Sequence, residues 1–156
     1  MPFKIYRGET VIAEGESPLA ITGLDPNTEV AAGEYQATSI DGDRESDRVD
    51  IPAFKTLPIA VTGVTVSPKT STAEAGTAGS RQLTATIEPT NATNKGVTYS
   101  ISPTTTGLTV SNSGLIEWTE DVPAGQYTTT VTTDDGGKTD THTLTLTEPP
   151  EPDPEG

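Results

Sequence analysis

The stretch QYTTTVTTDDGGKTDTHTLTLT, residues 126–147, decides the fold class of this chain. Its two ends, residues 126–132 and 139–147, are rich in threonine, with valine and leucine between the threonines. Side chains branched at Cβ fit the half-buried, pleated surface of a β-strand better than a helix. Between the two ends, Asp134-Asp135-Gly136-Gly137 is typical of a turn, because glycine tolerates a positive φ. The stretch therefore predicts a pair of strands around a turn.

The same pattern of short strands and turns extends toward the N-terminus as far as residue 61. Residues 81–87 alternate with period two, which places Leu83, Ala85 and Ile87 on an inward face. Seven or so short strands at regular spacing are typical of a β-sandwich, which we expect to span residues 61–147. The further expected strands are residues 61–66, 97–101, 107–110 and 115–118.

A separate, smaller β module is expected over residues 1–55. Within residues 34–40, Tyr35, Ala37 and Ser39 alternate onto one face. The five segments with a strand pattern are residues 3–7, 10–14, 19–24, 34–40 and 48–51.

The two modules are joined by residues 56–60, which we expect to form a short, fairly stiff linker containing a proline. The last residues, EPPEPDPEG (148–156), alternate acid with proline. Such a segment can neither pair in a sheet nor bury apolar surface, so it predicts a disordered acidic tail. The predicted fold class is all-β, with tandem immunoglobulin-like β-sandwiches followed by this tail.

Composition excludes several classes of function. The net charge of −14 disfavours binding to nucleic acid or to anionic membranes. Because the chain has no cysteine, disulfides and thiolate metal sites are excluded. The first residues, MPFKIYRGETVIAEGE, lack the pattern of a secretory signal peptide, and no apolar run approaches transmembrane length. We therefore expect a protein that is made in the cytoplasm and leaves it only when something else carries it out.

Three motifs in the second module carry a family resemblance: VTGVTVSP (61–68), RQLTATIEP (81–89) and above all NATNKGVTYS (91–100). Together they resemble the bacterial Ig-like domain of group 2. The following GLTVSNSGLIEW (107–118) and AGQYTTTVTTDDGGKT (124–139) are closer to cadherin-like and Putative Ig modules. The resemblance implies a β-sandwich.

The first module shows a second resemblance. ITGLDPNTEV (21–30), EYQAT (34–38) and DGDRESD (41–47) lie where a fibronectin type III domain has its E–F corner, F strand and F–G loop. The module resembles the back half of that domain, truncated because only about twenty residues precede the corner. Val30 stands where that family usually has a corner tyrosine.

Modules of both kinds are similar to those of tailed-bacteriophage decoration, head-fibre and tail-appendage proteins. The resemblance implies a non-enzymatic structural protein on the virion surface, assembled in the host cytoplasm and forming a homo-oligomer on the particle. The first module would dock on the major capsid protein or another virion protein, since a unit of this size buries only about 60% of its unfolded surface and gains from docking. The second module would project outward and strengthen the shell or grip host surface glycans weakly. For the docking contact we expect residues of the first hairpin: Phe3, Ile5, Tyr6 and Val11.

Three alternatives stay open. The chain could be a tail-associated phage protein, a spacer of a bacterial surface adhesin, or a carbohydrate-binding module of an enzyme. Adhesin domains are exported through signal peptides and anchored to the wall, and neither element is evident here. This contrast favours the virion.

No catalytic residue, cofactor or metal is expected. His142 is the single histidine, and because it alternates with threonines we expect it to face solvent. The acids of residues 41–47 are spaced as in a calcium loop, but Ser46 and Pro52 replace the required glycine and glutamate. A solvated hairpin loop is therefore the expected structure there.

The aromatic residues of the second module allow two interpretations. Trp118, Tyr99 and Tyr127 could form a platform for stacking a sugar. A module with so few large side chains needs its aromatics inside, so core packing is the favoured interpretation.

Overall fold

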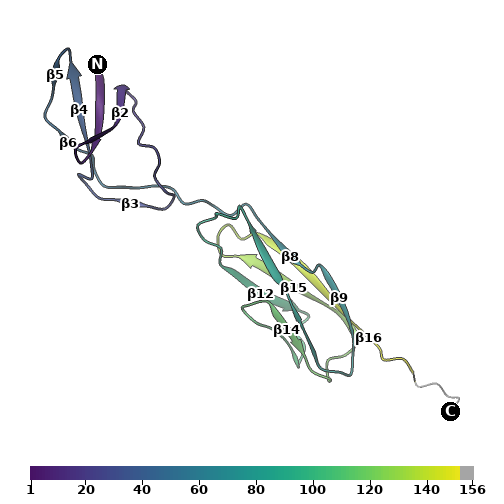
Figure 1. Cartoon of the computed structure of the whole chain (residues 1–156). Helices are drawn as coiled ribbons and strands as arrows, with labels where there is room; N and C mark the ends of the chain where they lie inside the picture. The colour runs from purple at the N-terminus through teal and green to yellow at the C-terminus, as the bar shows by residue number, and fades with distance from the viewer. Residues whose placement is uncertain (152–156) are drawn as a thin grey trace. The chain divides into compact units, whose positions relative to one another are not determined.

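The structure is a computed structural model that describes residues 1–151, and every regular element in this range is a strand (Figure 1). The all-β prediction is confirmed. The chain divides into two compact units: the first is Met1–Ile59, and the second begins at Ala60. Much of the tail expected at residues 148–156 lies outside the described residues, and residues 148–151 form no regular element.

The first unit is built around one antiparallel sheet in the order β2-β1-β4-β5, with β6 also paired to β4. A separate two-stranded pair, β3–β7, forms a second, smaller layer. The register of β1 against β2 shifts between Ile5 and Tyr6, as at a β-bulge. The strands are β1 (Pro2–Arg7), β2 (Thr10–Glu16), β3 (Glu29–Val30), β4 (Tyr35–Asp41), β5 (Arg44–Glu45), β6 (Val49–Asp50) and β7 (Phe54–Lys55).

The core of the first unit lies between these two layers. Ile5 of β1, Tyr35 of β4 and Val30 of β3 are its buried residues. The partners Ile5↔Ala37 and Phe3↔Ser39 place the expected face of β4 on this side of the sheet. The partly buried residues around the core are Ala13, Leu19, Ile21, Leu24, Ile51 and Phe54.

The strand expected at residues 19–24 is wrong. The segment has no regular structure, although Leu19, Ile21 and Leu24 pack against the core. Apolar spacing reports which side chains are buried, but a strand also needs a neighbouring backbone to pair with. Among the described residues no strand lies alongside this segment.

The segment expected as a linker begins inside the first unit. Thr56 donates its backbone N–H to the Thr28 carbonyl and its hydroxyl to the Asp25 carbonyl. The Leu57 carbonyl accepts the Asn27 N–H. Residues 56–57 therefore continue the first unit.

The second unit is a sandwich of two layers. One layer holds two separately paired sheets, β11–β8 and β10-β14-β13, and β10 leads along the chain into β11. In the other the order is β12-β15-β16-β9, and β9 runs parallel to β16. The strands are β8 (Gly63–Ser67), β9 (Thr70–Glu74), β10 (Gly79–Gln82), β11 (Thr84–Glu88), β12 (Val97–Ser102), β13 (Leu108–Val110), β14 (Leu115–Trp118), β15 (Gly125–Thr133) and β16 (Thr139–Thr147).

Side chains of both layers meet in one apolar cluster. Val66 of β8 and Ile116 of β14 come from one layer, Tyr127 of β15 and Leu144 of β16 from the other, and Ile116 and Leu144 are fully buried. Alternate residues of β16 point outward and are threonines, as the period-two pattern predicts. The further buried members are Ala75, Leu83, Leu108, Trp118, Val122, Val131 and Leu146.

Candidate interaction surfaces

The outer face of the first unit's sheet carries a polar cluster centred on Glu45. The Tyr6 hydroxyl lies 2.5 Å and the Thr38 hydroxyl 2.8 Å from Glu45 Oε1, and Lys4 Nζ lies 3.2 Å from Oε2. Hydrogen bonds from Tyr6 and Thr38 lower the pKa of the Glu45 carboxyl to about 2. The same contact with Glu45 raises the pKa of Tyr6 and of Lys4. These partners explain why Thr38 is buried on a face that alternation assigns to solvent.

Arg48 covers the exposed side of this cluster. Its guanidinium carbon lies 4.1 Å from the centre of the Tyr6 ring, a cation–π geometry. Its Nη1 donates to the Gly8 carbonyl at 2.8 Å, and both terminal nitrogens reach the Glu9 carboxylate. Arg48 thereby ties the β1–β2 turn to the segment before β6.

The four residues expected to contact a partner lie on two faces of the sheet. Phe3 and Ile5 lie on the inner face of the sheet, where Ile5 is buried in the core and Phe3 is half-buried beside it. Tyr6 and its partner Val11 lie on the outer face, where Tyr6 is buried beneath Arg48 and Val11 is 42% exposed. The structure therefore does not bring the four together as one surface.

Sequence reasoning missed four other large exposed apolar side chains of the first unit. Met1 is 66%, Ile12 40%, Val49 66% and Leu57 84% exposed. Alternation did not mark Ile12, because the register shift between Ile5 and Tyr6 leaves this residue without a partner on β1.

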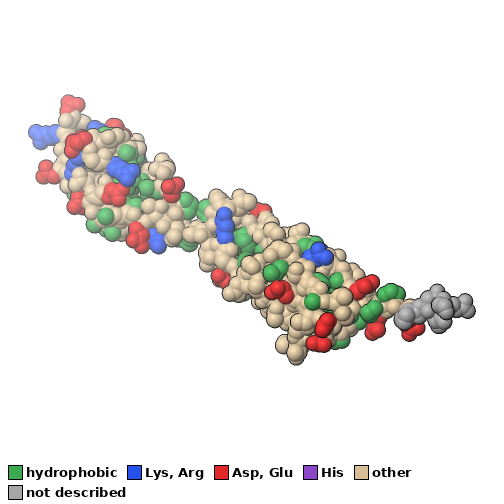
Figure 2. All heavy atoms as spheres, turned by 60° about the horizontal axis from the view of Figure 1, so that its bottom comes forward, with side chains coloured by type: hydrophobic (Ala, Val, Ile, Leu, Met, Phe, Trp, Pro, Cys, Tyr) green, Lys and Arg blue, Asp and Glu red, His purple; other side chains and the backbone are tan. Residues whose placement is uncertain are grey.

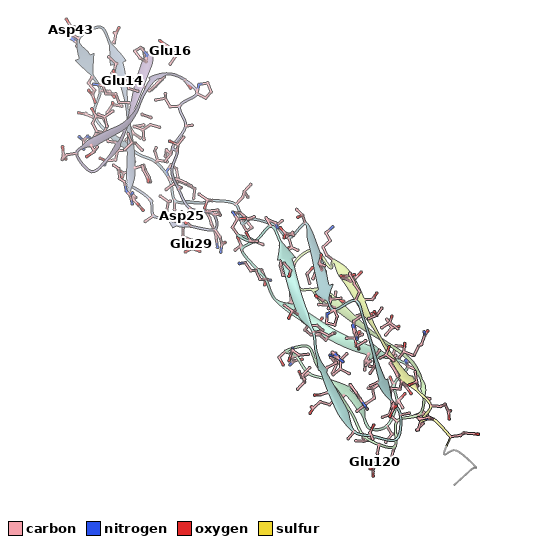
Figure 3. The ribbon with its side chains drawn as sticks, turned by 45° about the vertical axis from the view of Figure 1, so that its right-hand side comes forward. Glu14, Glu16, Asp25, Glu29, Asp43 and Glu120 are labelled. Atoms are coloured by element: carbon pink, nitrogen blue, oxygen red, sulfur yellow. The ribbon has the colours of Figure 1, made fainter. Side chains whose placement is uncertain are left out.

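Acidic side chains lie at both edges of this sheet. Glu14 and Glu16 lie on edge strand β2, and Asp43 lies at the tip of the β4–β5 hairpin at the opposite edge (Figure 3). Charges on an edge strand disfavour pairing with another chain. The hairpin expected within residues 41–47 is present, with Asp41 paired to Arg44. Among the described residues, no group of three or more His, Asp or Glu is arranged to hold a metal ion.

The prediction that His142 faces solvent is wrong. Its side chain is 0% exposed, with Nδ1 2.7 Å from the Pro68 carbonyl and Nε2 2.9 Å from the Ser71 hydroxyl. A carbonyl can only accept, so Nδ1 carries a hydrogen, and in the neutral ring Nε2 accepts from Ser71. The signal was in β16, because His142 shares its parity with the inward Leu144 and Leu146.

Asp140, two residues before His142 on β16, contacts the same segment around Pro68. Its Oδ2 accepts the Val66 N–H at 2.6 Å and pairs with the Lys69 ammonium. The hydrogen bonds from Lys69 and Val66 lower the pKa of the Asp140 carboxyl. His142 and Asp140 are structural groups that fasten the segment around Pro68 to β16.

The aromatic residues of the second unit do not form a platform. Trp118 and Tyr127 are buried, Trp118 donating to the Thr77 carbonyl at 3.1 Å and Tyr127 to the Pro123 carbonyl at 2.8 Å. The core-packing interpretation is confirmed for both. Tyr99 is half-buried against the core, and burial raises the pKa of its hydroxyl.

Tyr99 also reaches a groove of about 390 Å³ beside β11. The Gln82 amide nitrogen is held at its rim by the Leu83 and Ser113 carbonyls, both at 2.8 Å. Among the residues that line the groove, Lys95 alone carries charge. The lining residues are Gln82, Leu83, Thr84, Ala85, Ile87, Lys95, Val97, Tyr99, Asn112 and Ser113.

The charged side chains visible in Figure 2 gather on the first unit, whereas much of the visible surface of the second is uncharged. On the outward face of the β12-β15-β16-β9 sheet, Ser102, Thr128, Thr143 and Thr70 follow one another across the four strands. Among the described residues, no helix is long and apolar enough to cross a membrane.

Comparison with known proteins gives a family match and a set of similar proteins. Residues 60–148 match the family model described as "Putative Ig domain". An "Ig-like virion protein" of Serratia phage KSP90 is 39% identical over 112 residues, which are 70% of this chain and 40% of that protein. The chain thus spans about two fifths of the length of this relative.

Remote structural likenesses extend over both units. The titin domains Z1Z2 in complex with telethonin align with 95% of this chain and 82% of their own, at 16% identity and a TM-score of 0.44. The fibronectin(III)-like modules of Clostridium thermocellum CbhA align with 94% and 78%, at 15% identity and a TM-score of 0.36.

Proposed function

The chain belongs to the Putative Ig domain family of bacterial Ig-like modules found in phage proteins, and from this premise we propose that it is a non-enzymatic structural component of a bacteriophage virion. The observation that carries the proposal is the 39% identity with an Ig-like virion protein. In the proposal, the first unit docks on the capsid and the second is displayed outward.

The build of the first unit supports a docking role. Three buried residues form its core, and the outer face of its main sheet carries a polar cluster in which Tyr6 and Thr38 bond Glu45. Val11 and Ile12, adjacent on edge strand β2, expose apolar surface that a partner could cover. A unit of this size has a marginal core of its own, and burial against a larger body would add to its stability.

The second unit has the properties of a displayed module. Its apolar residues are enclosed between two layers, and its outward β12-β15-β16-β9 face offers hydroxyls and no charged side chain in the row from Ser102 to Thr70. In the proposal this face also serves weak adhesion to host surface glycans, because hydroxyls both donate and accept hydrogen bonds.

The test is the composition of purified particles of the phage that encodes the chain. We expect the full chain to co-purify with particles at a fixed copy number. Val11→Glu should lower that copy number, because it places a charge on the proposed docking face. The matched control is Thr109→Glu, which puts the same charge on an exposed strand residue of the second unit.

Absence of the wild-type chain from purified particles would contradict the virion assignment. Equal incorporation of both variants would leave the virion assignment standing and contradict docking through this face. Retention on tail fragments after the heads are removed would replace the capsid with the tail as the docking partner.

A further inference from the structure

Within the described residues, the edge of β11 that faces the groove is unpaired, whereas the preceding strand β10 is paired with β14 on the same side. β10 pairs with β14, and the same line continues with the Leu83 N–H donating to the Gly114 carbonyl at 2.9 Å. There the β13–β14 hairpin turns back, with the Gly114 N–H bonded to the Ser111 carbonyl. Alongside Thr84–Glu88, the described part of the chain therefore supplies β8 on one side and no strand on the other.

Two residues of β11 direct their backbone groups toward this empty side. N–H directions alternate along a strand, and the Leu83 N–H points toward β14. Val66, which lies opposite Ala85, sends its own N–H to Asp140 and away from β11. Ala85 is therefore a non-hydrogen-bonded position of the β8–β11 pair. Its N–H and C=O, and those of Ile87 two residues later, face the groove.

The bottom of the groove beside this edge is formed by apolar side chains that are only partly buried. Val97 and Tyr99 of β12 are half-buried, and Leu83 is buried beside them. These side chains belong to the interior of the sandwich and are accessible here because the β13–β14 hairpin stops short. Asn112 and Ser113 form one rim of the groove, and Lys95 lies on its wall.

We propose that this groove accepts an extended polypeptide segment, which adds a strand to β11 by pairing with Ala85 and Ile87. At about 3.3 Å per residue, the free edge from Thr84 to Glu88 suits a segment of about four residues. The segment carries an aliphatic side chain over Tyr99 and Val97. It carries an acidic residue at the Lys95 end, since Lys95 is the charged member of the lining in a chain of net charge −14. The inference goes beyond the proposed function and does not depend on it.

A polypeptide fits this edge better than a second folded copy or a glycan. An extended polypeptide presents backbone N–H and C=O groups at every second residue, which is the spacing of Ala85 and Ile87. Such main-chain pairing is a recurrent mode of peptide recognition. A second copy would bring another net charge of −14 to the same place, which opposes association.

The test uses the full chain and a random octapeptide library selected against it. We expect the selected peptides to slow amide hydrogen exchange at Ala85 and Ile87, which exchange faster than Thr84 and Thr86 in the free protein. Ala85→Pro removes an N–H that faces the groove and leaves the β8 ladder intact, as proline is tolerated where the N–H points off the sheet. The Ala85→Pro substitution should weaken peptide binding about tenfold or more, because one hydrogen bond to the peptide is lost and the proline ring occupies space at the paired edge.

The matched control is Thr86→Pro, which removes an N–H on the β8 side and should unfold the second unit as followed by Trp118 fluorescence. If Ala85→Pro also fails to fold, Ser113→Arg fills the rim from an exposed position and should abolish peptide binding in a folded protein. The proposal is overturned by any of three results. These are a library that yields no binder, binders that protect another strand edge, and peptides or an oligosaccharide that bind Ala85→Pro and Ser113→Arg as they bind the wild type.

Discussion

The two units use similar strand patterns but are stabilised differently. In the first, residues 1–59 include sixteen charged side chains and three buried core residues. In the second, the same number of charges is spread over the remaining 97 residues, and eleven buried residues form one cluster between two layers. The second unit therefore depends on its interior. The first depends on a small core together with hydrogen bonds on its outer face.

This difference shows that similar strand patterns can give modules of different stability, because the pattern alone does not set the size of the core. A unit with a shallow core is expected to be marginal, and polar contacts on a sheet face contribute less than apolar burial. The sole tryptophan, Trp118, reports on the second unit alone, so fluorescence and circular dichroism together separate the two transitions.

Leu144→Ala should produce the largest effect and confine it to the second unit. Leu144 is fully buried, and removing a buried leucine costs about 2–5 kcal/mol of unfolding free energy through lost burial and the cavity left behind. Urea denaturation followed by Trp118 fluorescence measures the loss. The neighbouring outward Thr145→Ala is its control, and a shift of the first unit's transition would show that the units are not independent.

His142→Leu should have the next largest effect. It removes the partners of the Ser71 hydroxyl and the Pro68 carbonyl, and a buried polar group left unpaired costs about 1–3 kcal/mol. Fluorescence-monitored denaturation should show a lower midpoint than the wild type. An unchanged midpoint would mean that the buried histidine contributes nothing to the seam between Pro68 and β16.

Acid should weaken the first unit through Glu45. Its pKa in the folded state, about 2, lies below the ordinary value of 4.5, so the unfolded state binds more protons between these values. The stability it contributes is complete above about pH 4.5 and is lost as the pH falls toward 2. Asp140 contributes with the same sign in the second unit, because its pKa is also lowered.

Glu45→Gln separates the two contributions. Thermal unfolding by circular dichroism at pH 7 and pH 3 should show a smaller pH-dependent shift of the first unit in the variant than in the wild type. The transition reported by Trp118 should keep its pH dependence. An equal shift of the first unit in both proteins would contradict the role given to Glu45.

The smallest effect is expected from Thr145→Ala. Thr145 points outward from β16 and should change the unfolding free energy by no more than about 0.5 kcal/mol. The same denaturation series measures it. A cost comparable to that of His142→Leu would show that the threonine face stabilises the sheet and does more than keep it hydrated.

Much of the fold follows from local pattern. The β1–β2 and β15–β16 hairpins were predictable because alternating residues flank glycine turns, with Gly136 and Gly137 both at positive φ. The inward position of Trp118 followed from the need of a small module for large core residues. Local pattern failed where pairing decides the outcome, as in residues 19–24, whose leucine and isoleucine side chains are half-buried against the core without forming a strand.

The candidate surfaces were harder to predict because their members are distant in sequence. Tyr6 and Glu45 are separated by 39 residues, and no spacing rule links them. The groove beside β11 exists because the β13–β14 hairpin ends opposite Leu83. The turn motif in the sequence predicts the hairpin but not the position along β11 at which it ends. For His142, the parity of β16 carried the answer, but the surrounding threonines suggested the opposite face.

The measurement that tests the account most directly is amide hydrogen exchange of the full chain, free in solution and bound to purified phage particles. The account predicts fast exchange in β1, β2 and β4 of the free chain and strong protection of these strands on the particle. The core strands β14, β15 and β16 should exchange slowly in both states. Equal exchange of the first unit in the two states, or protection gained in the second unit's core strands instead, would contradict it.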